Sequence, residues 1–296
     1  MTATRTPTGA LITPNADLRE AFLRDGYVVV PGVLDDDLRQ RLIMVTDRVV
    51  AAQMAEHTSR HKTTGSMVQI TSDPVYVDLV TLPSAIEALA RLGYPTPSFS
   101  DGWVISKPAG GPRLFWHYDW FTWQDDASLG REPCQISMMY YLNSTRVQNG
   151  CLRVLPGSHN THNPMHDVLS SPRGDLSAGT NMDSPEFTDR PDEVDVPITA
   201  GDVLITDARL LHAGHPNTTT ERRRLVTLWY QPDPAGLPER MLAQLAGKRQ
   251  APPSGWPVEY RRRLESILVR YDGHAVAYER APYRRLPDPE PARVRS

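Results

Sequence analysis

Hydrophobic positions along the chain follow two different spacings. In 17–25, 35–55 and 84–92, apolar residues recur every three or four positions, which predicts amphipathic helices. Acidic residues begin the first two helices, and Ser84 and Glu87 form a capping box at the start of the third. The same spacing predicts two further helices, at 239–245 and 258–269.

The middle of the chain has a period of two, which is typical of β-strands. Ile136 and Met138 alternate with Ser137 and Met139, so this segment has two distinct faces. A strand is also expected at 27–30. Glycine, proline and asparagine separate the other short strands, which are 103–107, 113–120, 135–142, 151–155, 202–206 and 225–230. Helices followed by short strands predict an all-β core with flanking helices, a double-stranded β-helix or cupin-like jelly roll.

No repeat or linker in the sequence demands a second domain. We expect one jelly-roll domain over 15–280, preceded by a flexible Thr/Pro-rich arm at 1–14 and followed by a frayed Pro/Arg-rich tail at 281–296. A long polar segment, 160–195, interrupts the strands. Loops of that length inside a domain are usually lids or disordered, and a lid is the preferred interpretation.

Composition excludes several classes of protein. With 296 residues, 40% hydrophobic, a net charge of −3 and pI ≈ 6.3, the chain fits a globular protein without a nucleic-acid partner. It has no apolar run of membrane-spanning length and no secretion signal at its start, so we expect a cytoplasmic location. Cys134 and Cys151 lack metal-site spacing and are expected to be reduced core thiols.

His117 and Asp119 are the first candidates for chemistry. They lie two residues apart in a predicted strand, so their side chains point to one face while Tyr118 points away. One more histidine would complete a 2-His-1-carboxylate set, which holds non-haem Fe(II) and leaves coordination positions open. Two downstream histidines, His212 and His215, compete for that role.

Several motifs follow one another in a fixed order. They are FLRDGYVVVPGVL at 22–34, WHYD at 116–119, NGCLRVLPGSH at 149–159, GDVL at 201–204, and LHAG at 211–214 with Asn217 and the arginines at 222–224. Together they resemble the phytanoyl-CoA dioxygenase family of Fe(II)/2-oxoglutarate-dependent oxygenases. The resemblance implies the iron ligands His117, Asp119 and His212, Arg223 as the 2-oxoglutarate arginine, and O₂ as the second cosubstrate.

The cosubstrate's distal carboxylate needs a permanently charged, forked donor, which arginine supplies better than lysine. On a strand, Arg223 points opposite to Arg222 and Arg224, so only one face of the cluster reaches the pocket. Lys107 and Gln135 are further candidates for the cosubstrate site. An exposed surface lysine is an equal alternative for Lys107, and Gln135 depends on the strand register.

The segment 115–123 is also similar to ectoine hydroxylases, and this resemblance implies that its Thr-Trp end lines the substrate pocket. Trp120, Thr122 and Trp123 are therefore the candidate substrate residues, with plain core packing as the alternative for the tryptophans. The similarity ends after Trp123, which argues against ectoine itself as the substrate.

Other charged and imidazole side chains receive simpler interpretations. His159 lies in a Pro-Gly-Ser-His turn and is expected to be structural, and His162 and His166 are expected to be solvated in the lid. Arg153 is interpreted as a surface residue.

The sequence thus predicts a non-haem Fe(II)/2-oxoglutarate-dependent dioxygenase. It would hydroxylate or otherwise oxidise a small molecule, a secondary-metabolite intermediate or amino-acid derivative, and release succinate and CO₂. Because related halogenases carry a small residue in place of the carboxylate, Asp119 argues against halogenation. The alternatives are an acyl-CoA or carrier-bound hydroxylase and a non-catalytic jelly-roll protein that binds a metal or metabolite.

Overall fold

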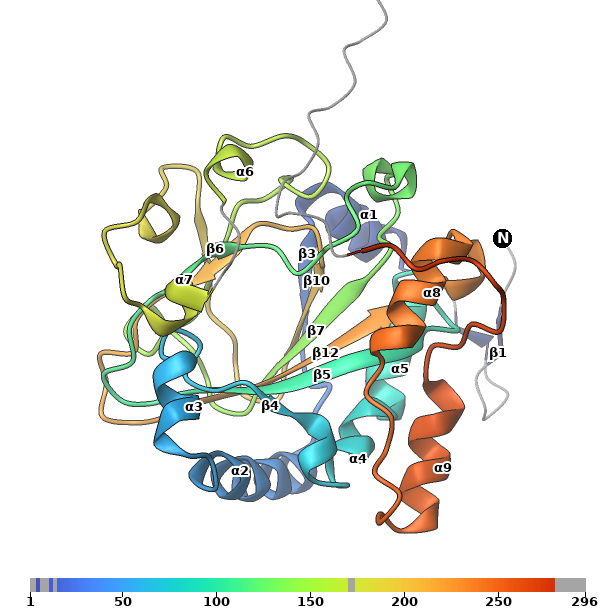
Figure 1. The fold of residues 1–296 in the computed structure, drawn as a ribbon, viewed down its shortest axis with the longest axis horizontal. Coiled ribbons are helices and arrows are strands. Elements are labelled where there is room, and N and C mark those ends of the chain that lie inside the picture. The colour runs from blue at the N-terminus through green and yellow to red at the C-terminus, as the bar shows by residue number, and fades with distance from the viewer. Residues whose placement is uncertain (1–3, 6–10, 13–14, 170–173, 280–296) are drawn as a thin grey trace, which may run out of the picture.

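Two antiparallel sheets face each other and form the core of the protein (Figure 1). The computed structural model describes residues 4–5, 11–12, 15–169 and 174–279. The larger sheet has the strand order β3 (Tyr27–Val30), β10 (Val203–Asp207), β7 (Ile136–Tyr141), β12 (Arg223–Gln231), β5 (Ser98–Lys107) and β4 (Val68–Gln69). The smaller sheet has the order β6 (Leu114–His117), β11 (His212–Gly214), β8 (Leu152–Val154) and β9 (Val194–Val196). Neighbouring strands in both sheets are antiparallel, which confirms the predicted jelly roll.

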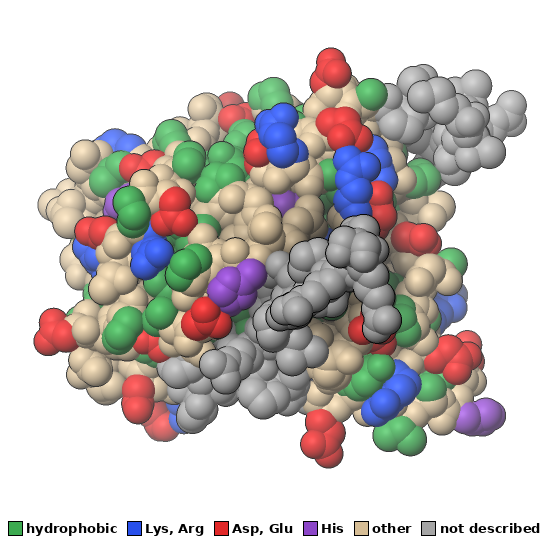
Figure 2. All heavy atoms as spheres, turned by 90° about the horizontal axis from the view of Figure 1, so that it is seen from above, with side chains coloured by type: hydrophobic (Ala, Val, Ile, Leu, Met, Phe, Trp, Pro, Cys, Tyr) green, Lys and Arg blue, Asp and Glu red, His purple; other side chains and the backbone are tan. Residues whose placement is uncertain are grey.

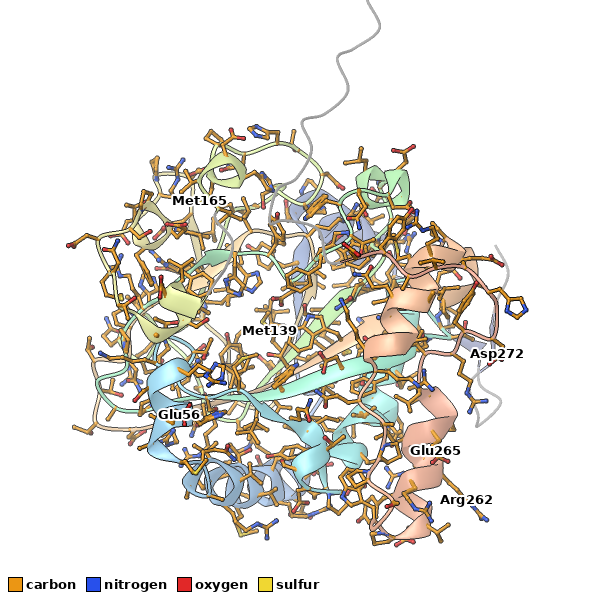
Figure 3. All side chains as sticks on the ribbon, viewed as in Figure 1. Glu56, Met139, Met165, Arg262, Glu265 and Asp272 are labelled. Atoms are coloured by element: carbon orange, nitrogen blue, oxygen red, sulfur yellow. The ribbon has the colours of Figure 1, made fainter. Side chains whose placement is uncertain are left out.

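Alternation along the strands of the larger sheet sends side chains to two environments. Ile136, Met138 and Tyr140 of β7 point outward into a hydrophobic core shared with the helices. Met139 and Tyr141 point inward and pack with residues of the smaller sheet. Met139 is labelled near the middle of the barrel in Figure 3. The predicted period of two is confirmed, and the inward face becomes the floor of the functional cavity.

Helices cover the outer face of the larger sheet (Figure 1). Those that contribute buried residues to this shared core are α1 (Ala16–Asp25), α2 (Asp36–Ala51), α4 (Tyr76–Val80), α5 (Pro83–Arg91) and α9 (Val258–Ile267). Arg262 and Glu265 of α9 point away from the sheet (Figure 3). The five helices predicted from apolar spacing are present. The one expected over 35–55 ends at Ala51, and a separate helix, α3 (Ala55–Arg60), follows it.

The N-terminal ends of α2 and α5 are built differently. Asp35 caps α2, and its carboxylate accepts a hydrogen bond from the backbone N–H of Leu38 at 2.8 Å. The capping box expected of Ser84 and Glu87 is wrong. Because Pro83 already occupies the first turn of α5, Ser84 lies inside the helix, and its hydroxyl donates to the Val33 carbonyl at 2.6 Å.

This difference predicts unequal effects of two alanine substitutions. Asp35→Ala should lower the free energy of unfolding by about 1 kcal/mol, because it leaves the Leu38 N–H without its cap. Glu87→Ala should change it by less than about 0.5 kcal/mol, as is usual for a substitution that removes no specific contact. Urea unfolding of the two variants measures both values, and a larger loss for Glu87→Ala would contradict the capping assignment.

The long segment 160–195 contains more regular structure than the sequence indicates. It forms α6 (Met165–Val168), α7 (Gly174–Ala178), a 3₁₀ turn at Pro185–Phe187 and β9. The expectation of a solvated His166 is wrong, since its side chain is fully buried, whereas His162 is exposed. Leu176 and Phe187 pack on Phe115 beside the candidate ligand strand. The described part of this segment therefore packs against the smaller sheet.

Arg153 of β8 is buried, so its interpretation as a surface residue is wrong. Its guanidinium lies 5.1 Å from the centre of a Trp116 ring and pairs with Asp189 at 2.7 Å and Glu193 at 3.2 Å. Both carboxylates come from the irregular segment that covers the smaller sheet. No strand or helix pattern in the sequence indicates where that segment folds back.

The two ends of the chain are described only in part. Thr4–Arg5 and Leu11–Ile12 pair as a two-stranded ladder, while the rest of the expected arm at 1–14 and the expected tail at 281–296 lie outside the described residues. Within the described residues, no helix combines the length and the hydrophobicity needed to span a bilayer.

Candidate metal and cosubstrate site

The smaller sheet brings His117, Asp119 and His212 together. His117 ends β6, and its ladder partner across the sheet is His212, the first residue of β11. Asp119 follows the end of β6, which is shorter than the predicted strand, and its backbone N–H donates to the Ala208 carbonyl at 2.8 Å. The carboxylate lies 3.8 Å from His117 Nε2 and 3.9 Å from His212 Nε2. One ligand atom from each residue thus lies within 4.8 Å of the other two.

Backbone carbonyls orient both imidazoles. His117 Nδ1 lies 2.9 Å from the Phe115 carbonyl, and His212 Nδ1 lies 3.0 Å from the Leu210 carbonyl. Because a carbonyl oxygen only accepts, each Nδ1 carries the proton, and each Nε2 turns a lone pair toward Asp119. Two such nitrogens and one carboxylate on one side of a cavity fit Fe(II).

The neighbouring histidine His215 is placed differently. Its Nε2 lies 2.6 Å from a carboxylate oxygen of Asp195, outside the cluster of His117, Asp119 and His212. His159 is buried, and its Nε2 lies 3.2 Å from the Leu23 carbonyl. Its ring packs directly on Gly26: a Cβ added to this glycine would lie 2.6 Å from His159 Nδ1. These positions select His212 as the partner of the His-x-Asp pair.

A cavity of about 350 Å³ opens in front of the three side chains and extends to Arg223. A second cavity, of about 380 Å³, shares Met67, Asp119 and Trp229 with the first. The two cavities therefore meet at Asp119. We call them the arginine cavity and the outer cavity.

Arg223 supplies a buried positive charge to the arginine cavity. Its side chain points inward from β12, while Arg224 points outward to Asp47 of α2 at 2.7 Å, as the alternation predicts. Burial lowers the pKa of Arg223, and none of the described ion pairs includes it. Its Nε has no hydrogen-bond partner among the described residues, and its guanidinium lies 5.5 Å from the Tyr141 ring. A buried arginine without a carboxylate partner fits a site for an anionic ligand.

Lys107 and Gln135 lie on different sides of Asp119. Lys107 is the ladder partner of Arg223 and lines the arginine cavity, so the alternative of an exposed surface lysine is wrong. Its ammonium donates to the carbonyls of Pro112 and His215, and burial lowers its pKa. Gln135 lines the outer cavity and not the arginine cavity.

The predicted substrate residues are divided between cavity wall and core. Trp120 and Thr122 line the outer cavity, where the Thr122 hydroxyl donates to Gln244 at 2.7 Å. Trp123 is not among the residues that line either cavity. It is fully buried, and its ring packs edge-on against Tyr118 at 5.3 Å.

Sequence reasoning missed an acidic and aromatic group on the floor of the outer cavity. Asp101 and Trp103 come from β5, and Trp229 comes from β12 on the same inward face as Arg223. Burial, reinforced by the nearby Asp119, raises the pKa of Asp101 to about 6 despite three hydrogen bonds to its carboxylate. Counting in steps of two from Arg223 leads to Trp229 and from Lys107 to Asp101, but only strand pairing places these two residues side by side.

Two histidines and a carboxylate share a cavity of this jelly roll with a buried arginine. This combination is characteristic of the non-haem Fe(II)- and 2-oxoglutarate-dependent dioxygenases. Residues 22–225 match the phytanoyl-CoA dioxygenase (PhyH) family, and the chain belongs to that family. It is a dioxygenase that uses iron, 2-oxoglutarate and O₂, and the predicted class of enzyme and cofactors are confirmed.

Relatives and solved structures agree with this assignment. The chain is 24% identical over 230 residues to the multifunctional dioxygenase prhA of Penicillium brasilianum, covering 73% of this chain and 72% of that protein. It is 25% identical over 236 residues to the ectoine dioxygenase of Sphingopyxis alaskensis, covering 71% and 73%. The crystal structure of EctD from S. alaskensis with bound Fe has the same fold, with a TM-score of 0.55, 22% identity and coverage of 91% and 88%.

Proposed function

We propose that this dioxygenase hydroxylates or otherwise oxidises a small organic molecule, an intermediate of secondary metabolism or an amino-acid derivative, while 2-oxoglutarate becomes succinate and CO₂. The observation that carries the proposal is the junction of the two cavities at Asp119. The arginine cavity has the charge for a dicarboxylate. The outer cavity, with Trp120 and Phe121 in its wall, offers an aromatic surface to a second molecule.

Different residues of this chain would have different roles in that reaction. His117, Asp119 and His212 would hold the iron, which when bound supplies the oxygen activation and the oxidation of the substrate. Arg223 would bind the distal carboxylate of 2-oxoglutarate from the floor of the barrel. Apolar walls around the junction limit the access of water and fix which part of the substrate faces the metal.

An acyl-CoA or carrier-bound substrate finds less support. Its phosphates would need a cluster of basic side chains around the entrance. Among the described residues that line the outer cavity, Lys248 is the single basic side chain, and on the face that Figure 2 shows, arginine and lysine side chains are interspersed with aspartate and glutamate. A non-catalytic binding role also has less support, because the metal ligands and the buried arginine occur in one cavity.

Anaerobic reconstitution with Fe(II) and 2-oxoglutarate tests the proposal. We expect a visible metal-to-ligand absorption band that decays on addition of O₂, with formation of succinate. The His117→Ala variant should show neither signal, because it loses one of three ligands. If the parent protein produces no band and no succinate and resembles His117→Ala, the chain is a binding protein.

A further inference from the structure

We propose that Asp101, Trp103 and Trp229 form a subsite for a cationic nitrogen of the substrate, a primary amine or a quaternary ammonium group. The inference rests on the proposed function, because it names a chemical feature of the molecule that the outer cavity would receive. Asp101 and Trp229 are direct ladder partners on β5 and β12, and Trp103 is two residues along β5 on the same face.

Asp101 has an unused acceptor position. A carboxylate offers about four acceptor positions. Three are occupied: Oδ1 accepts from the Gly102 N–H at 2.8 Å and from the Gln250 side-chain amide, and Oδ2 accepts from the Trp103 indole N–H at 3.0 Å. These donors fix the orientation of the carboxylate on the cavity wall. One position on Oδ2 remains for a donor from a bound molecule.

No ion pair among the described residues balances the charge of Asp101. None of the described ion pairs involves Asp101, although its side chain is largely buried. Lys248, at the end of α8 (Glu239–Lys248), also lines the outer cavity, but the groups that act on the Asp101 carboxylate are Trp103, Gly102, Asp119 and Gln250. Asp119, the other acidic residue in the wall, belongs to the metal ligands. A desolvated carboxylate without a counter-ion favours a cationic ligand over a neutral one.

Aromatic rings around Asp101 favour the same kind of ligand. Trp103 and Trp229 line the cavity next to it, and Trp120 and Phe121 line another part of the wall. Indole faces attract a cation within about 6 Å of the ring centre, and more strongly when water is excluded. An aromatic wall around one carboxylate binds an ammonium group through both charge and ring contacts. A neutral alcohol would obtain only one hydrogen bond there.

Two small probes that differ in charge test the subsite directly. We would measure binding of 2-phenylethylamine and of its neutral counterpart 2-phenylethanol by calorimetry, under anaerobic conditions with Fe(II) and 2-oxoglutarate present. In the parent protein the amine should bind about tenfold more tightly or better, as expected for a charge-assisted contact. Asp101→Asn should reduce this preference to about threefold or less, because it removes the charge.

Alcohol binding is the internal control for the shape of the cavity. Asp101→Asn should leave it within about twofold, and Asp37→Asn, which removes an exposed carboxylate on α2, should leave both affinities unchanged. Equal affinities for amine and alcohol in the parent protein would overturn the inference even if Asp101→Asn does not fold. An unchanged preference in a folded Asp101→Asn would also overturn it. Failure of the parent protein to bind Fe(II) or 2-oxoglutarate would instead overturn the proposed function. The same experiment detects this failure, because both must bind before the probe is added.

Discussion

Replacing His212 with alanine should lower the affinity for Fe(II) by more than about 100-fold and abolish succinate formation. Even residues that only orient a ligand cost about 10–100-fold in metal affinity, and His212 presents its Nε2 to the metal position itself. Its loss leaves one imidazole and one carboxylate. The Fe(II) affinity is measured by anaerobic titration, with the metal-to-ligand band as a second signal.

His215→Ala is the matched control. It removes the same side chain three residues away, but this imidazole contacts Asp195 and not the cluster of metal ligands. We expect Fe(II) binding within about threefold of the parent, since substitutions away from such features have small effects. If His215→Ala loses iron and His212→Ala keeps it, the ligand assignment is wrong.

Local patterns in the sequence were sufficient to predict most of the fold and the proximity of His117 and Asp119. The period of two in 135–142 predicted both the strand and its two faces, and alternate side chains of this fully buried strand enter two different hydrophobic cores. His117 and Asp119 share a face for the same reason, although the strand ends at His117. The choice between His212 and His215 required the family resemblance, since both lie more than 90 residues after His117 in the sequence.

Features that depend on pairing between distant segments could not be predicted. Asp101 and Trp229 become neighbours only through the register of β5 and β12. Arg153 is buried because an irregular segment folds over it and supplies two carboxylates. Trp123 shows the opposite case: it lies near the ligands in sequence, but its ring packs into the core. Nearness along the chain therefore placed Trp120 and Thr122 correctly in the wall of the outer cavity, but not Trp123.

The second large effect is expected from Arg223→Met. This substitution should raise the Kd for 2-oxoglutarate by about 100-fold or more, because it removes one partner of a buried ion pair. Iron binding should change little, because Arg223 contacts none of the three ligands among the described interactions. Arg223→Lys should lie between the parent and Arg223→Met, since it keeps the charge but lacks the fork. Calorimetry with 2-oxoglutarate and titration with Fe(II) separate the two affinities. Arg224→Met is the control: this neighbour points outward to Asp47, so the Kd should stay near that of the parent.

Thermal unfolding provides a test of the same residue without turnover. Without cosubstrate, the Arg223 guanidinium is desolvated, which lowers its pKa, and none of the described carboxylates pairs with it. Removing this unbalanced charge should leave the Tm of Arg223→Met equal to or above that of the parent. In the parent, 2-oxoglutarate at 100 times its Kd should add about 2.7 kcal/mol to the free energy of unfolding, and this gain should nearly vanish in the variant at the same concentration. A variant that is much less stable without ligand, or is stabilised as strongly by 2-oxoglutarate, would show that Arg223 has a structural role and that another residue binds the cosubstrate.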